Sequence, residues 1–199
     1  MSDAFVAVRP DRVIFAGNSD SDPNEAQVLG WTGAREHAAH GTLQCTWRAI
    51  PQARRTHALM LSRPFWMWGA QMGANEHGVA IGNAAEFARA ALAPDGLPGA
   101  DLVRLGLERG ASAAEAVEVI AALLAEYGQG AGCHNSFLVA DRREAWLLES
   151  VGRDSARERI ASGVRAIAGT SALPALTPRS RRLQAWITGA RARHARVEA

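Results

Sequence analysis

The chain has 199 residues, of which 48% are hydrophobic and 21% are charged, and its formal net charge is +2. These values indicate one globular domain over residues 1–199 with a sizeable core, and they exclude a disordered or collagen-like chain. The sequence contains no lysine, which also excludes Schiff-base, phosphate-loop and general-base lysines. The N-terminus has neither the basic nor the apolar region of a signal peptide, and a glutamate interrupts the apolar stretch 116–125. We therefore predict a cytoplasmic protein with no membrane partner.

The N-terminal third is predicted to consist of strands. Residues 5–8 and 13–15 flank an Arg-Pro-Asp turn, and we expect them to form a hairpin that begins almost at the first residue. The polar stretch 18–41 is expected to be irregular. Residues 43–50 and 56–61 are expected to form two further strands. The second of these is continuously apolar, which predicts that it is covered on both faces.

The rest of the chain predicts a hairpin, two helices and more strands. Glycines punctuate the hairpin at residues 66–83, which suggests close approach of its backbone to a ligand or another strand. Helices are expected over residues 100–109 and 112–127, with Ser112 and Glu115 as a capping box and Gly128 as the stop. Further strands are expected at residues 136–140, 144–149, 157–160 and 164–168, and an Arg-rich helix at 179–197. This order favours an α+β fold with antiparallel sheets and segregated helices.

Cysteine and histidine spacing gives no sign of a disulfide framework or a metal site. Cys45 and Cys133 are far apart in the sequence, and no cysteine pair or His-x-x-x-His spacing is present. We expect two reduced thiols, no metal and no cofactor. The Arg-rich C-terminal segment is compatible with nucleic acid, but the rest of the chain is not basic. A solvated helical tail over residues 170–199 is therefore the preferred interpretation, with no nucleic-acid partner.

The segments SRPFWMWGA at residues 62–70 and MGANEHGVAIGN at residues 72–83 resemble the secernins and their bacterial dipeptidase relatives. The resemblance covers about residues 4–168, including Asn18-Ser19-Asp20 and the segment HNSF at residues 134–137. It implies an αββα sandwich of the N-terminal nucleophile (Ntn) hydrolase type. It also implies an amide or peptide hydrolase, specifically a dipeptidase, with a small peptide or amide as substrate. Because family chains are much longer, the sandwich is expected to be incomplete at its C-terminal end.

The resemblance also implies a nucleophile. In this family the first residue of the mature chain supplies both nucleophile and base, and the nucleophile is normally a cysteine three residues before the Phe-Val-Ala strand. Ser2, exposed by removal of Met1, stands at that position. A serine hydroxyl needs a base, and a terminal α-amino group with a pKa of roughly 7.7 to 8.0 suits that task. The alternative is that Ser2 is an ordinary second residue.

Four further residues are candidates for the site. Asp20 matches the family acid near the terminal amine, although Asn-Ser-Asp is also a common turn signal. Asn83 matches the position expected to donate its amide to the oxyanion, and the alternative is an asparagine that caps a hairpin end. Asn18 and Trp68 are candidate substrate-binding residues, although tryptophans in a strand are often part of the core. His77 is expected to be structural, because the family mechanism does not call for a histidine.

Several differences from the family favour another hypothesis. Serine replaces cysteine, Gly17 stands where relatives carry a basic residue, and Gly169 stands where they carry an asparagine. The alternative function is therefore a catalytically degenerate family member that acts as a binding or scaffold protein. A sandwich that lacks strands exposes sheet edges and apolar faces, which a partner chain or a homo-oligomer would have to cover.

Overall fold

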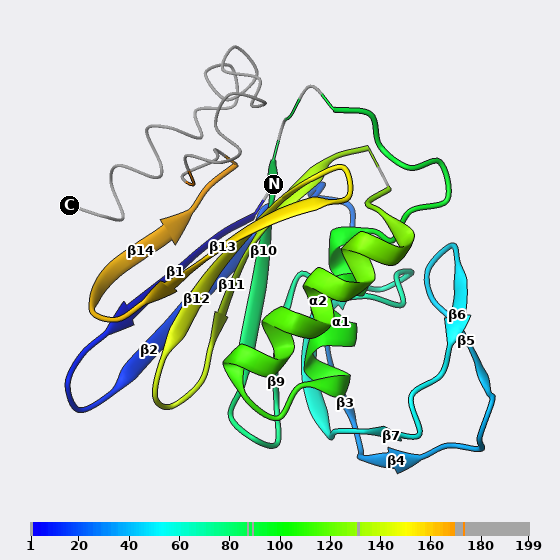
Figure 1. The fold of residues 1–199 in the computed structure, drawn as a ribbon, viewed down its shortest axis with the longest axis horizontal. Coiled ribbons are helices and arrows are strands. Elements are labelled where there is room, and N and C mark those ends of the chain that lie inside the picture. Colours follow the sequence, from blue (N-terminus) through cyan, green and yellow to red (C-terminus); the bar gives the residue numbers. More distant parts are fainter. Residues whose placement is uncertain (1, 87, 89, 131, 170–172, 174–199) are drawn as a thin grey trace.

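The computed structural model describes residues 2–86, 88, 90–130, 132–169 and 173 of the chain. Two helices and two main sheets make up most of this part (Figure 1). The elements are β1 (Ser2–Val8), β2 (Val13–Ser19), β3 (Gln27–Thr32), β4 (Arg35–Glu36), β5 (Thr42–Gln44), β6 (Ala49–Pro51), β7 (Arg55–Thr56), β8 (Leu59–Pro64), β9 (Met72–Asn75), β10 (Ala80–Glu86), α1 (Gly99–Arg109), α2 (Ala113–Tyr127), β11 (His134–Ala140), β12 (Ala145–Val151), β13 (Asp154–Ile160) and β14 (Gly163–Ile167).

The strands of each main sheet are all antiparallel to their neighbours. One sheet has three strands in the order β14-β1-β2, and the other has seven in the order β13-β12-β11-β10-β9-β8-β3. Helices α1 and α2 cover one face of the seven-stranded sheet, and the three-stranded sheet packs against its other face (Figure 1). The described residues thus form three layers, one of helices and two of strands.

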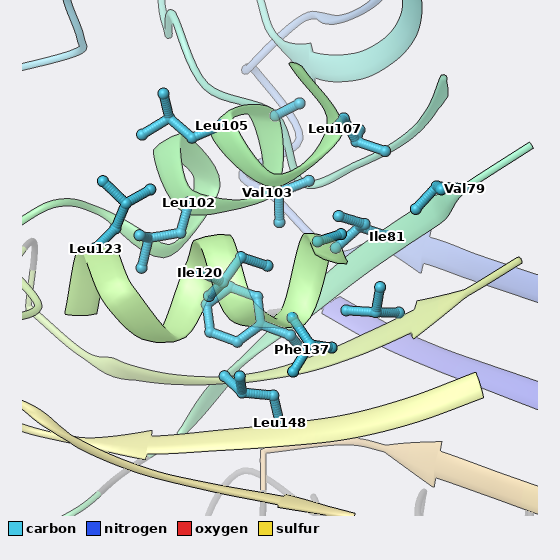
Figure 2. Close-up of a cluster of buried hydrophobic side chains, with 14 of the residues drawn as sticks. Val79, Ile81, Leu102, Val103, Leu105, Leu107, Ile120, Leu123, Phe137 and Leu148 are labelled. Carbon is cyan, nitrogen blue, oxygen red and sulfur yellow. The ribbon is translucent and has the colours of Figure 1, made fainter. Parts of the chain in front are cut away.

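The larger hydrophobic core lies between the helices and the seven-stranded sheet. Figure 2 shows side chains of α1 and α2, among them Val103 and Ile120, facing Ile81 of β10 and Phe137 of β11. All four are fully buried, and each contributes about 1.5–3 kcal/mol by leaving water. Gly106 lets α1 approach closely, because a Cβ there would lie only 2.9 Å from Ile81 Cδ1.

A second core joins the two sheets. Val6 of β1 and Ile167 of β14 pack against Leu138 of β11 and Leu147 of β12, and all four are almost fully buried. Along β1, the buried residues Ala4 and Val6 alternate with the less buried Asp3 and Phe5, as the two-residue period of a strand predicts. This packing fixes the position of the N-terminal strand, and therefore of Ser2, relative to β10 and β11.

The predicted helix ends are confirmed. Ser112 is the N-cap of α2, and its Oγ accepts a hydrogen bond of 3.2 Å from the backbone N–H of Glu115. The Glu115 carboxylate in turn accepts from the backbone N–H of Ala111 at 2.9 Å. Gly128 ends the helix with a φ of 70°, a conformation that glycine adopts without strain.

The predicted N-terminal hairpin, the 66–83 hairpin, both helices and the four later strands are confirmed, whereas the stretch 18–64 differs from expectation. The stretch 18–41 contains β3 and β4, and residues 43–50 form a hairpin of β5 and β6 with a turn at 45–48, rather than one strand. The backbone N–H of Cys45 closes that turn on the carbonyl of Arg48 at 2.9 Å. The predicted helix at 179–197 lies outside the described residues.

The prediction that the strand at 56–61 is covered on both faces is wrong. Met60 of β8 is 44% exposed, and it lies beside Trp31 of β3, which is 70% exposed. Met60 belongs to the same row of the sheet as Ala140, which the three-stranded sheet buries. The three-stranded sheet packs mainly over β10 and β11, so this face is buried near β11 and open near β8. In the described part of the chain, no helix is long and apolar enough to span a membrane.

Candidate active site

Strand pairing places Ser2 and Asp20 at the same end of the three-stranded sheet. Ser2 is the first residue of β1, is 8% exposed and is registered opposite Ser19, the last residue of β2. Asp20 follows Ser19 directly and is exposed. Two residues distant in sequence therefore lie at one strand end.

Polar side chains join this strand end to the second sheet. The hydroxyl of Ser19 donates to Gln71 Oε1, and Gln71 Nε2 donates to the hydroxyl of Ser21 at 3.0 Å. Gln27 of β3 also donates to Gln71 Oε1, at 3.2 Å. Gln71 lies just before β9, so these contacts hold the end of β2 against the seven-stranded sheet.

Asn83 reaches the same region from β10. Its Nδ2 donates to Oδ1 of Asn135 on β11 at 2.5 Å. An amide Nδ2 carries two hydrogens, so one remains for another acceptor. The Oδ1 of Asn83 is buried and has no hydrogen-bond partner among the described residues. An unsatisfied buried polar atom is costly and is typical of a site completed by a ligand or water.

Ser2 and Asn83 line one pocket with a volume of about 200 Å³. The other lining residues come from the segment before β9, from β10 and β11 and from the start of α1; they are Met67, Gln71, Ala85, Pro98, Gly99, Ala100, Cys133 and Asn135. None of these side chains is charged. The pocket is smaller than those that hold drug-sized ligands, which span about 300–1,000 Å³. It therefore suits a small, uncharged group.

Asn135 is held rigidly at the base of this pocket. It is only 2% exposed, and its backbone N–H donates to Gln129 Oε1 at 3.1 Å. The hydroxyl of Ser150 donates to the Asn135 carbonyl at 2.9 Å. At Gly99, a Cβ would lie 2.3 Å from Asn135 Cγ, so only glycine allows the first turn of α1 to sit against this side chain. Sequence reasoning missed the role of Asn135, although the residue lies in the HNSF segment that carried the resemblance.

Cys133 is the other nucleophilic side chain of the pocket. Burial raises the pKa of its thiol, against a smaller opposing effect of the Asn135 side chain 3.9 Å away. The thiolate is the reactive form of cysteine, so a raised pKa makes this thiol a poor nucleophile at neutral pH. Among the described residues that line the pocket, Cys133 is also the only one with a metal-ligating side chain, so these residues offer no set of metal ligands.

The two predicted substrate-binding residues do not line the pocket. Trp68 packs against the larger core, and the guanidinium carbon of Arg104 lies 4.2 Å from the centre of its ring. Its neighbour Met67 lines the pocket instead. Asn18 is exposed on β2 and is registered opposite Asp3. The structure thus brings together Ser2 and Asn83 in one pocket, with Asp20 near the same strand end, and it places Asn18 and Trp68 outside it.

Solved structures with the same fold include an acylase and two forms of a hydrolase. Penicillin V acylase from Agrobacterium tumefaciens matches with a TM-score of 0.52 and 16% identity, over 79% of this chain and 49% of that one. A mutant of the conjugated bile acid hydrolase from Clostridium perfringens matches with a TM-score of 0.58 and 11% identity, over 88% of this chain and 55% of that one. A second variant of that hydrolase has a TM-score of 0.58 and 10% identity, with the same coverage. The chain therefore spans about half the length of the structures it matches.

These similarities confirm the predicted fold class, an αββα sandwich of the Ntn hydrolase type. The described residues supply one helical layer and both sheets of that sandwich. A sequence profile of Peptidase family C69 matches residues 48–168, which is more than half of the chain. The matched region contains Asn83, Asn135 and the first turn of α1. This chain is a member of Peptidase family C69.

Proposed function

We propose that this protein hydrolyses amide bonds of small peptides, as a dipeptidase, with Ser2 as its terminal nucleophile. The observation that carries the proposal is the shared pocket of Ser2 and Asn83, which come from different sheets. A nucleophile and an amide donor beside one small cavity are two of the groups that acyl transfer requires, and the free α-amine of Ser2 would supply the base. Membership of a peptidase family supports the same reaction class.

The reaction begins when Met1 has been removed and the α-amine of Ser2 is free. Ser2 Oγ attacks the substrate carbonyl carbon while its proton passes to the α-amine. The second hydrogen of Asn83 Nδ2 donates to the developing oxyanion, and the first stays on Asn135. The C–N bond then breaks, and the leaving amine takes the proton from the α-amine. Water hydrolyses the ester by the same route and restores the Ser2 hydroxyl.

Asp20 is proposed to orient the terminal amine. A carboxylate near an ammonium group favours its charged form, which is the form that follows proton transfer from Ser2. The contacts of Ser19 and Gln71 fix the end of β2, and with it the position of Asp20. Asp20 thus takes the supporting role that an acid plays in other nucleophile and base pairs.

The uncharged lining predicts the kind of substrate. A pocket of about 200 Å³ without charged side chains favours a substrate residue with a small, uncharged side chain, such as glycine or a residue with a short apolar side chain. Charged side chains would lose their hydration without gaining a partner. The substrate-binding roles of Asn18 and Trp68 stay predictions. Because neither lines the pocket, we expect Asn18→Ala and Trp68→Phe to raise KM less than Gln71→Ala does.

The test is hydrolysis of a dipeptide panel by wild type, Ser2→Ala and Ser2→Cys, with Ser155→Ala on the exposed edge of β13 as matched control. We expect Ser2→Ala to be inactive, Ser155→Ala to match wild type and Ser2→Cys to retain activity, since a thiol is the stronger nucleophile. Equal rates for wild type and Ser2→Ala would refute the proposal. A processed but inactive wild type would favour the binding or scaffold alternative. A cytoplasmic location is part of the proposal and is tested by cell fractionation.

A further inference from the structure

A second cluster of reactive side chains lies at the end of α1 opposite the pocket. His57 precedes β8, and Glu76 and His77 form the turn between β9 and β10. The backbone N–H of His57 donates to the carbonyl of Glu108 near the C-terminal end of α1, whereas Gly99 at the other end lines the pocket. This cluster has no role in the proposed hydrolysis.

We propose that His57, Glu76 and His77 form a binding site for a divalent transition-metal ion of the Zn²⁺ class. One ligand atom from each side chain lies within 4.8 Å of the other two. His57 Nδ1 is 3.1 Å from His77 Nε2 and 3.7 Å from Glu76 Oε1. Tetrahedral zinc with bonds of about 2.0–2.1 Å places its ligand atoms about 3.3–3.4 Å apart. The two measured distances lie on either side of that value.

The chemistry of the three groups selects the metal. Two imidazoles and one carboxylate are a common ligand set for zinc and neighbouring ions, whereas Mg²⁺ and Ca²⁺ require oxygen ligands. The cluster is partly open to solvent, with Glu76 38% exposed, so water can complete the coordination. Metal binding needs neutral imidazole.

The backbone holds the ligands in place without the metal. The backbone N–H of Glu76 donates to the carbonyl of Ala58 at 2.8 Å, and the N–H of Ala58 donates to Glu76 Oε1 at 3.0 Å. This reciprocal pair fixes the carboxylate beside His57. Oε1 has two lone pairs, so one accepts from Ala58 and the other remains for a metal.

Asn75 fixes the turn that carries His77. Its Nδ2 donates to the carbonyls of Leu107 and Gly110 at 2.9 and 2.7 Å, and its Oδ1 accepts from the N–H of His77 at 3.1 Å. Asn75 is 8% exposed. The turn is therefore attached to the end of α1, and little conformational entropy remains to be lost when a metal binds.

A hydrogen bond between the two rings accounts for their contact in the metal-free protein. A single N–H between His57 Nδ1 and His77 Nε2 satisfies both atoms, and binding of a metal must displace that proton. The proposal does not depend on the proposed function, because none of its residues lines the pocket.

The test uses the full chain after removal of metal with a chelator. Titration with Zn²⁺ followed by calorimetry is expected to give one saturable site per chain, and Co²⁺ is expected to give the visible spectrum of a nitrogen- and oxygen-bound ion. His57→Ala and His77→Ala should each weaken zinc binding at least about 10-fold, since even loss of an outer partner costs about 10–100-fold. Glu76→Gln should weaken binding while still accepting the hydrogen bond from Ala58.

His40→Asn is the matched control, because His40 is exposed, lies outside the cluster and has a φ of 61° that asparagine tolerates. It should bind zinc as wild type does, and circular dichroism should show that every variant is folded. Absence of saturable binding to wild type at 100-fold excess over about 1 μM protein would overturn the proposal. Equal affinity of wild type and a folded His57→Ala, His77→Ala double variant would also overturn it.

Discussion

Removal of the Asn83 amide is predicted to slow the chemical step far more than it weakens substrate binding. Asn83 Nδ2 donates one hydrogen to Asn135 Oδ1, at a nitrogen–oxygen distance of 2.5 Å. Its other hydrogen is available to the pocket. Loss of one preorganised oxyanion donor lowers kcat about 10²–10³-fold, equivalent to about 2.7–4 kcal/mol. We expect this loss in Asn83→Ala with little change in KM, because the interaction strengthens only when charge develops on the carbonyl oxygen.

Asn135→Ala tests whether Asn135 acts through Asn83. Without its Oδ1 acceptor, the Asn83 amide loses the contact that fixes its orientation, and misplacement of such a group by about 1 Å can cost about 100-fold in rate. We therefore expect kcat to fall about 10- to 100-fold. Stability should fall by about 1–3 kcal/mol, because a buried partner is removed. Urea denaturation measures the second effect separately from the first.

The double variant gives the sharpest result. If Asn135 only positions Asn83, the Asn83→Ala, Asn135→Ala variant should be no slower than Asn83→Ala alone. The assay is steady-state kinetics on the best dipeptide, at enzyme concentrations corrected for the folded fraction. Multiplicative effects of the two substitutions on kcat would refute the positioning role, and an unchanged kcat in Asn83→Ala would refute the oxyanion role.

Three further predictions concern stability, pH and association. Gly73→Ala should lower the free energy of unfolding by about 1–3 kcal/mol, since its Cβ would lie 2.5 Å from the backbone oxygen of Met60; an unchanged urea midpoint would contradict this. Burial alone would raise the pKa of the Asp141 carboxyl. Hydrogen bonds from backbone N–H groups, of which that of Ala113 has the largest effect, instead lower the pKa below its ordinary value of 3.8. The ionised Asp141 carboxylate therefore stabilises the folded protein above pH 3.8, and this stabilisation is lost as pH falls further. Asp141→Asn should lower the free energy of unfolding by about 1–2 kcal/mol at pH 7, and by less in acid. Self-association, expected from the sequence, should appear as a dimer or larger species by light scattering, and a monomer at 100 μM would contradict it.

The parts of the fold that sequence predicted well are those with strong local signals. The helices α1 and α2 have regular apolar spacing, and Ser112 and Gly128 mark the ends of α2. Strand β3 was missed because its exposed apolar residues, Leu29 and Trp31, alternate within a stretch that reads as polar. Its position is fixed only by pairing with β8, a partner distant in sequence.

The residues of the candidate site also differ in how far the sequence could predict them. Ser2, Asp20 and Asn83 came from resemblance to a family, and their spacing alone carries no chemical signal. Asn135 could not be assigned a role, because its contact with Asn83 depends on the register of β10 against β11. The proposed metal site of His57, Glu76 and His77 could not be predicted either, because it also depends on contacts between segments distant in sequence.

In that cluster, His57 and the Glu76-His77 turn are separate in sequence, and only the packing of β8 and β9 brings them together. No motif search based on short spacing can detect such a set. The sequence-based expectation of no metal rested on the lack of such spacing.

The central claim is that Ser2 is a terminal nucleophile with a free α-amine, and mass spectrometry tests it most directly. Wild-type protein is treated briefly with a small activated ester and quenched in acid, because a protonated α-amine cannot take the acyl group from the Ser2 oxygen. Its intact mass and N-terminal peptide are then measured before and after hydroxylamine. The account predicts a chain without Met1 that gains one hydroxylamine-sensitive acyl group on Ser2, and a Ser2→Ala variant that gains none. A chain that retains Met1, or an equal hydroxylamine-sensitive adduct in Ser2→Ala, would contradict it.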